Sequence, residues 1–157
     1  MNKKICFIGH RQIFDSSVES RLIKEVQNQI DLGNTCFMVG THGDFDKLAL
    51  SVCRRLRDKY KQITITVVLT SLAKINYKIC GELMNVYDDV DTVMYNIEEE
   101  FFKRRITASN KYMINDCDIL ICYVNPDYVN SGAKLISNYA KKQGLEVINL
   151  YKQLKIE

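Results

Sequence analysis

The sequence contains little proline or glycine, no tryptophan and no long apolar run. One proline and seven glycines in 157 residues, with 46% hydrophobic and 26% charged residues, exclude the collagen-like, low-complexity and disordered classes. No apolar run approaches the roughly 18 residues of a membrane span. The basic start of the chain leads into a short apolar run, Ile5–Ile8, which predicts a first strand and not a signal peptide. We therefore expect a single domain over residues 1–157.

An excess of charge of one sign is also absent. Lysine and arginine number 22 and aspartate and glutamate number 19, which gives a net charge of +3. Dedicated DNA-binding modules are usually more strongly basic. The near-balanced charge therefore argues against a nucleic-acid partner, and the missing apolar span argues against a membrane.

The six cysteines include no Cys-x-x-Cys pair, and the two histidines, His10 and His42, are not spaced from any cysteine as zinc ligands usually are. We therefore expect no metal ion and no cofactor. Cys6, Cys36 and Cys122 lie inside apolar runs, where cysteine behaves as a small buried hydrophobic residue. Together with the missing signal peptide, this pattern predicts reduced thiols and a cytoplasmic location.

Apolar runs alternate with amphipathic segments along the whole chain. The runs predicted as strands are Lys4–Ile8, Thr35–Val39, Ile63–Leu69, Thr92–Asn96, Ile119–Val124 and Glu146–Leu150. The segments predicted as helices are Val18–Leu32, Phe45–Tyr60, Ile79–Val86, Glu98–Asn115 and Ser131–Lys142. Strands separated by helices pair in parallel through right-handed crossovers, and continuous apolar strands indicate a sheet covered on both faces. The sequence thus predicts an α/β, Rossmann-like, doubly wound and mostly parallel sheet with helices on both faces.

The loop after the first predicted strand reads Gly9-His10-Arg11. In a doubly wound sheet, ligands bind beyond the carboxyl ends of the strands, where such loops lie. A glycine lets the backbone approach a ligand, and an arginine can make forked contacts to phosphate or carboxylate. The same residues also fit a simple turn with a solvated arginine.

A glycine-containing segment follows the second predicted strand. It places Gly40, Thr41, His42, Gly43, Asp44 and Asp46 at the start of a predicted helix. Backbone N–H groups and the helix dipole favour a phosphate at such a position. The spacing matches neither the Gly-x-Gly-x-x-Gly nucleotide fingerprint nor a Walker loop. We predict a ligand-binding loop here, the alternative being that Asp44 and Asp46 cap the helix.

The loop after the most apolar predicted strand runs from Asn125 to Lys134 and enters the last helix through Ser131 and Gly132. Ser131 fits a helix N-cap. Gly132 fits less well, because a glycine in the first turn weakens a helix unless something must approach the backbone. We therefore include Asn125, Ser131, Gly132 and Lys134 in the predicted site.

Four segments look like motifs of a known family, whose patterns are given in parentheses. They are Cys6–Arg11 (C-F-x-G-H-R), Phe37–Ala49 (G-G-x-x-G-F-D-x-x-A), Asn110–Asp118 (R-N-R-x-M-V-D-x-S-D after its first letter) and Ser131–Ala140 (S-G-G-x-x-x-x-x-x-Y-A). In this order they resemble the SLOG superfamily, which groups the DNA-processing Smf/DprA proteins with the cytokinin-activating LOG phosphoribohydrolases. The nearer similarity is to the small bacterial and phage members like YpsA, and it spans nearly the whole chain.

The resemblance implies a Rossmann-like fold, self-association into a homo-oligomer, and a site for a nucleotide or nucleotide-derived ligand. Beside the three loops, that site would include Asn110 and Lys111. LOG-type hydrolases use an arginine ahead of K-x-x-M and a glutamate that closes P-G-G-x-G-T-x-x-E. The matching positions here hold Ser109 and the stretch Ile136–Asn138, so neither catalytic group is present.

We therefore expect a module that binds a nucleotide-like ligand as a sensor or a sequestering protein. The first alternative is a hydrolase that cleaves an N-glycosidic or phosphoester bond of a nucleotide. Its acid or base would have to come from His42, Asp44, Asp46 or Glu98–Glu100. The second alternative is a regulator that docks on another protein. The sequence assigns no catalytic residue.

Overall fold

The computed structural model describes residues 2–69, 91–94, 102–128 and 131–152. Its strands are β1 (Lys4–Gly9), β2 (Cys36–Val39), β3 (Thr64–Leu69), β4 (Asp91–Met94), β5 (Ile119–Tyr123) and β6 (Glu146–Asn149). Its helices are α1 (Val18–Asp31), α2 (Asp44–Lys59), α5 (Phe102–Asp116) and α6 (Gly132–Lys142). The predicted helix over Ile79–Val86 and the acidic residues Glu98–Glu100 lie outside the described residues.

The strands form a six-stranded sheet in the order β4-β3-β2-β1-β5-β6. Every pairing between neighbouring strands is parallel, as the predicted doubly wound architecture requires. The predicted α/β, Rossmann-like fold is therefore confirmed. From β1 the chain builds outward to β4 on one side and then crosses over to β5 and β6 on the other. This reversal opens a crevice at the carboxyl ends of β1 and β5.

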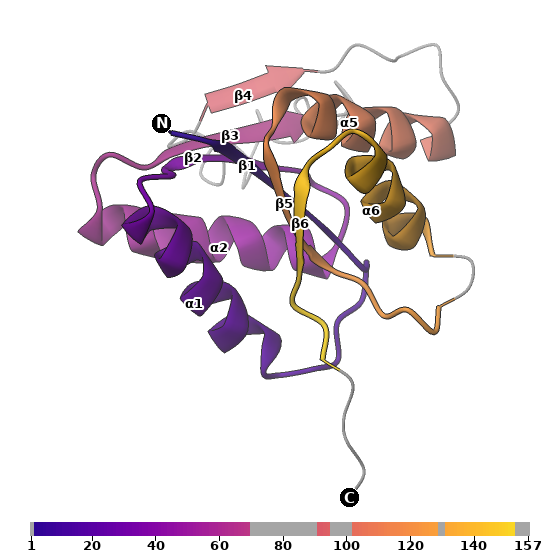
Figure 1. Cartoon of the computed structure of the whole chain (residues 1–157), viewed down its shortest axis with the longest axis horizontal. Coiled ribbons are helices and arrows are strands. Elements are labelled where there is room, and N and C mark those ends of the chain that lie inside the picture. Colours follow the sequence, from indigo (N-terminus) through magenta and orange to yellow (C-terminus); the bar gives the residue numbers. More distant parts are fainter. Residues whose placement is uncertain (1, 70–90, 95–101, 129–130, 153–157) are drawn as a thin grey trace, which may run out of the picture.

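Alternate residues of each central strand enter different cores. On β1, Ile5 and Phe7 belong to the core beneath α1 and α2, whereas Cys6 and Ile8 belong to the core beneath α5 and α6. Figure 1 shows the two helix pairs on opposite sides of the sheet. The continuous apolar sequence of β1 and β5 is explained by this double coverage, because no face of either strand meets water.

The amphipathic pattern of the first helix is confirmed residue by residue. Its apolar positions Val18, Leu22, Val26 and Ile30 are all buried against the sheet. The helix ends before Gly33, which adopts a positive φ of 89°. A left-handed glycine directly after the last turn is a common way to terminate a helix.

The buried cysteines behave as hydrophobic residues. Cys6 and Cys122 lie in the core beneath α5 and α6, as predicted, whereas Cys36 is partly exposed. Burial raises the pKa of Cys122 to about 12, so its thiol stays protonated and non-nucleophilic at neutral pH. No helix within the described ranges combines the length and the apolar character needed to span a bilayer.

Candidate functional site

A pocket of about 650 Å³ opens at the carboxyl ends of β1 and β5, where the crossover connections diverge. We call it the switch-point pocket. Its walls come from the end of β1, the starts of α2 and α6, and one turn of α5. The residues that line it are Ile8, Gly9, His10, Arg11, His42, Asp46, Ile106, Thr107, Asn110, Tyr128, Ser131, Gly132, Ala133 and Ile136.

The structure brings many of the residues predicted from the sequence into this one wall. Gly9, His10, Arg11, His42, Asp46, Asn110, Ser131 and Gly132 line the pocket. The predicted residues outside its lining are Gly40, Thr41, Gly43, Asp44, Lys111, Asn125 and Lys134. All three predicted loops therefore meet, but they contribute only part of their residues.

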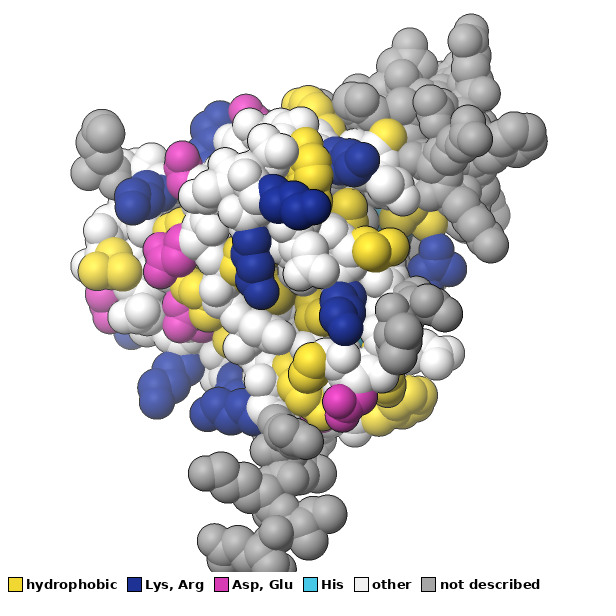
Figure 2. All heavy atoms as spheres, turned by 45° about the vertical axis from the view of Figure 1, so that its right-hand side comes forward, with side chains coloured by type: hydrophobic (Ala, Val, Ile, Leu, Met, Phe, Trp, Pro, Cys, Tyr) yellow, Lys and Arg dark blue, Asp and Glu magenta, His cyan; other side chains and the backbone are white. Residues whose placement is uncertain are grey.

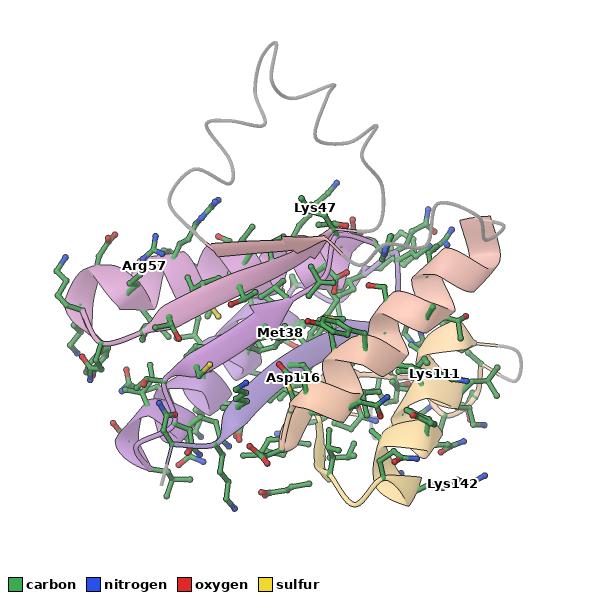
Figure 3. The ribbon with its side chains drawn as sticks, turned by 90° about the horizontal axis from the view of Figure 1, so that it is seen from above. Met38, Lys47, Arg57, Lys111, Asp116 and Lys142 are labelled. Carbon is green, nitrogen blue, oxygen red and sulfur yellow. The ribbon has the colours of Figure 1, made fainter. Side chains whose placement is uncertain are left out.

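The two predicted lysines make contacts elsewhere. The ammonium group of Lys111 lies 5.2 Å from the centre of the Tyr139 ring, so this side chain turns along α5 towards α6 (Figure 3). The ammonium group of Lys134 donates to the carbonyl of Pro126 at 3.1 Å. Among the described residues that line the pocket, Arg11 is therefore the one lysine or arginine that could supply charge for an anion.

His10 joins the loops that follow β1 and β5. Its backbone N–H donates to the carbonyl of Tyr123 at 3.3 Å, and its Nε2 accepts from the backbone N–H of Asn125 at 2.8 Å. Its Nδ1 lies 3.3 Å from the Ser131 hydroxyl, and its ring centre lies 4.9 Å from that of Tyr128. His10 therefore holds the loop after β1, the loop after β5 and the start of α6 together at the pocket.

These contacts determine which nitrogen of neutral His10 carries the proton. Because Nε2 accepts a hydrogen bond from Asn125, the proton must be on Nδ1, which donates to Ser131. An Nδ1 that donates to Ser131 cannot also take the proton of its hydroxyl. Ser131 is thus excluded as a nucleophile activated by His10. Its oxygen also accepts the N–H of Lys134 as the N-cap of α6.

Stability should depend on pH through His10. Burial lowers the pKa of His10 from its ordinary 6.5, so the unfolded chain binds this proton at a higher pH than the folded chain does. The stability contribution of neutral His10 is complete above about pH 6.5 and is lost as the pH falls below it. We expect the free energy of unfolding, measured by urea titration at pH 7.5 and 5.5, to fall less in His10→Gln than in the wild type. An equal fall in both proteins would assign the pH dependence to other groups.

The segment before α2 is held by its own hydrogen bonds. The N–H of Asp44 donates to the carbonyl of Arg11 at 2.8 Å, and the Asp44 carboxylate accepts from the N–H of Ile13 at 3.1 Å. The Asp46 carboxylate accepts from the N–H of His42 at 2.7 Å. The N–H groups of His42 and Asp44 are therefore not open to a phosphate. The Asp44 carboxylate connects two loops, whereas the Asp46 carboxylate binds the segment just before its own helix. The N-cap of α2 is Gly43, and no side chain makes an N-cap hydrogen bond there.

Two glycines of the motifs are explained by packing. A Cβ added at Gly9 would lie 2.5 Å from Cγ of Phe45, and a Cβ added at Gly43 would lie 2.5 Å from Cα of Arg11. Gly43 also has a φ of 149°, which is rare for any other residue. Both glycines therefore allow the loop after β1 to pack against the start of α2. In contrast, a Cβ at Gly132 would meet nothing within 4 Å.

Sequence reasoning missed several residues of the pocket wall. They are Ile8, Ile106, Thr107, Tyr128, Ala133 and Ile136. Most are apolar residues of strands and helices, which sequence patterns assign to the core. Tyr128 carried a usable sequence signal, because it is an aromatic residue in a loop predicted to follow a strand. In the structure its side chain is 52% exposed. Thr107 gave none, because its approach to the pocket depends on how α5 rotates against β1.

The positions that match the catalytic groups of LOG-type hydrolases offer no acid or base. Ser109 is fully buried and is not part of the pocket wall. Of the matching stretch, Ile136 adds an apolar contact to the pocket, and the buried hydroxyl of Ser137 donates to the carbonyl of Lys134. Within the described wall, Asp46 is the one carboxylate.

The fold is shared with a solved DNA-binding protein. DNA processing protein A from Helicobacter pylori, described for its single-stranded DNA binding mode, superposes with a TM-score of 0.68 at 15% identity. The match covers 98% of this chain and 67% of that chain. No protein-family model and no curated protein matches the sequence. At 15% identity this likeness shows a shared fold.

The expectation that nucleic acid is not a partner is wrong. It rested on the net charge of +3, whereas a protein with this fold binds single-stranded DNA. Net charge sums over the whole surface, but binding depends on the groups in one hollow. Figure 2 shows basic side chains scattered over the face that includes α5 and α6, with acidic side chains mostly to its left.

Proposed function

We propose that this chain binds a nucleotide or nucleotide-derived ligand in the switch-point pocket. The observation that carries the proposal is the meeting of Arg11, Ser131 and Gly132 at one cavity on the carboxyl edge of the sheet. The Arg11 guanidinium suits a phosphate, and the first turn of α6 adds backbone N–H groups and the positive end of its dipole. Gly132 leaves open space at that turn for a ligand oxygen.

The rest of the wall suits the sugar and the base. Thr107 and Asn110 offer hydrogen-bonding groups, while Ile106, Ala133 and Ile136 offer apolar contact. A cavity of about 650 Å³ is within the size range of small-molecule sites, which combine an apolar lining with a few polar groups. This composition supports a ligand that has one anionic end and one less polar body.

The polar groups of the pocket favour binding over hydrolysis. An enzyme of this class needs a general acid and a general base placed against the scissile bond. The Asp46 carboxylate accepts the N–H of His42, and His10 is fixed by Asn125 and Ser131. These groups hold the loops together, which supports capture of the ligand without cleavage.

Single-stranded nucleic acid is the second candidate ligand, and the likeness to the Helicobacter pylori protein favours it. Both candidates present a nucleoside phosphate to the pocket. In this proposal residues 1–157 act as one binding unit of the small YpsA-like kind. Self-association and a cytoplasmic location stay predictions.

Native mass spectrometry of the freshly purified protein tests the proposal. We expect a bound nucleotide that is released on denaturation and is recovered intact after incubation with fresh protein. Recovery of a shortened product would support the hydrolase instead. A protein that carries no ligand and binds neither nucleoside phosphates nor single-stranded DNA would contradict the proposal and favour the protein-docking alternative.

Arg11→Ala should weaken nucleotide binding without affecting the fold. Loss of a charge-assisted contact to phosphate removes about 1.5–3 kcal/mol, or about 10- to 150-fold in affinity. Arg11 is exposed, so we expect the free energy of unfolding to change by less than about 0.5 kcal/mol. Calorimetric titration with nucleoside monophosphates measures the affinity.

Arg55→Ala is the matched control, because it removes the same charge from an exposed position of α2 that pairs with Glu19. This variant should bind nucleotide as the wild type does. Equal weakening in the two variants would reduce the role of Arg11 to general electrostatic attraction.

A further inference from the structure

A second hollow lies directly beside the switch-point pocket. It has a volume of about 970 Å³, and we call it the aromatic hollow. The residues that line it are His10, Gln12, Phe14, Asp15, Ser16, Ser17, Arg21, Tyr123, Asn125, Tyr128, Tyr151 and Lys152. His10 and Tyr128 line both hollows and therefore stand between them.

Exposed aromatic side chains line the aromatic hollow. Among the described residues, the large apolar side chains left exposed are Phe14, Leu32, Tyr128 and Leu135. Both aromatic members of this set, Phe14 at 88% and Tyr128 at 52% exposure, line the hollow. Tyr123 and Tyr151 pack edge to face beside them, with ring centres 5.6 Å apart. An exposed phenylalanine is stabilised by a flat apolar partner that covers its ring.

The charged groups of the aromatic hollow differ in whether they could pair with a ligand. Arg21 donates to the Asp15 carboxylate, the Ser17 hydroxyl and the carbonyl of Leu150, so it is held in place. Hydrogen bonds from Ser17, together with Arg21, lower the pKa of Asp15 and keep its charge paired. Lys152 is exposed at the rim. The hollow thus combines aromatic faces, one compensated ion pair and a cation at the edge.

We propose that the aromatic hollow holds a second nucleobase, joined through a phosphate to the nucleotide in the switch-point pocket. This inference rests on the proposed function and extends its ligand from one nucleotide to two. Each hollow is large enough for one small ligand, and the two share a wall. Phe14 and Tyr128 provide stacking faces, and bases stack on such side chains with little dependence on sequence. Lys152, an exposed cation of the same lining, could pair with the next phosphate of a strand.

Affinities for three probes test the proposal. The probes are deoxyadenosine 5′-monophosphate, the 5′-phosphorylated dinucleotide of deoxyadenosine, and a single strand of about ten deoxyadenylates. We expect the dinucleotide to bind at least about 5-fold more tightly than the mononucleotide, because stacking contributes about 5- to 150-fold per base. Further tightening with the longer strand would identify a single-stranded nucleic acid as the source of the second base. Equal affinity of dinucleotide and strand would identify a dinucleotide.

The Phe14→Ala variant distinguishes binding in the aromatic hollow from binding in the switch-point pocket. We expect it to weaken dinucleotide binding by about 5- to 150-fold and to leave mononucleotide binding unchanged. Phe14→Tyr should restore the affinity, since its ring also stacks. Leu135→Ala is the control, because it removes another side chain that is 68% exposed but lies outside both hollows.

Different negative binding results distinguish an error in this inference from an error in the proposed function. If the mononucleotide binds and the dinucleotide binds no more tightly, the second base has no subsite and this inference is overturned alone. The same holds if Phe14→Ala leaves dinucleotide affinity unchanged. If none of the probes binds, the proposed function fails and the inference fails with it.

Discussion

Gly43→Ala is expected to lower the free energy of unfolding by about 2–6 kcal/mol and to abolish ligand binding. Gly43 has φ 149° and ψ −167°, a region occupied almost only by glycine, where other residues are strained by about 1–3 kcal/mol. A Cβ would also lie 2.5 Å from Cα of Arg11, and overpacking of this kind costs about 1–3 kcal/mol. Backbone on both sides of the contact leaves no flexible side chain to move away.

The loss of binding would follow from the position of this contact. The loop after β1 is joined to the start of α2 by the bond from the Asp44 N–H to the Arg11 carbonyl and by the bond from the Ile13 N–H to the Asp44 carboxylate. Separating the two backbones by enough to fit a methyl group strains both bonds. Arg11 would then leave the pocket wall.

Gly132→Ala is the matched control for the stability measurement. Its Cβ would meet nothing within 4 Å and would sit in the first turn of α6. We expect stability within about 1 kcal/mol of the wild type, on the stabilising side, because alanine has less freedom in the unfolded chain. Urea titrations followed by circular dichroism measure both variants. A Gly43→Ala protein as stable as Gly132→Ala would mean that these loops do not pack as described.

The fold could be predicted because its signals are local. Each central strand is an apolar run, and each described helix shows one apolar stripe, such as Val18, Leu22, Val26 and Ile30 on α1. Alternation of such elements restricts the chain to a parallel sheet, because parallel strands require long crossovers. The order of the strands then places the carboxyl ends of β1 and β5 beside a crevice.

The site could be predicted only in part, because side-chain direction is a property of packing. The family resemblance placed Asn110 and Lys111 together in the predicted site, but of these two residues of α5 only Asn110 lines the pocket. Packing also gives two glycines a role that the sequence does not reveal. The missing Cβ atoms of Gly9 and Gly43 make room for Phe45 and for the backbone of Arg11. Such contacts join residues far apart in the sequence, which single-sequence patterns do not reveal.

A double-mutant cycle between Gly9 and Phe45 gives the other large expected effect. Phe45 is fully buried, and its ring stacks near Tyr123 with centres 6.4 Å apart. Phe45→Ala should therefore lower the free energy of unfolding by about 3–5 kcal/mol. Gly9→Ala should lower it by about 1–3 kcal/mol, because its Cβ would lie 2.5 Å from Cγ and 2.6 Å from Cδ2 of that ring.

The double variant should be more stable than the sum of the single effects predicts, by about 1 kcal/mol or more. Removing the ring removes the atoms that the Gly9→Ala methyl group meets, and the space left behind lets the remaining Cβ of residue 45, at 2.7 Å, move away. Additive effects would contradict this explanation of Gly9 and would favour the alternative that a glycine is needed there for a ligand to approach the backbone. A positive coupling would instead show that the first glycine of the pocket is set by the core beneath it, so that the position of Arg11 depends on how Phe45 packs.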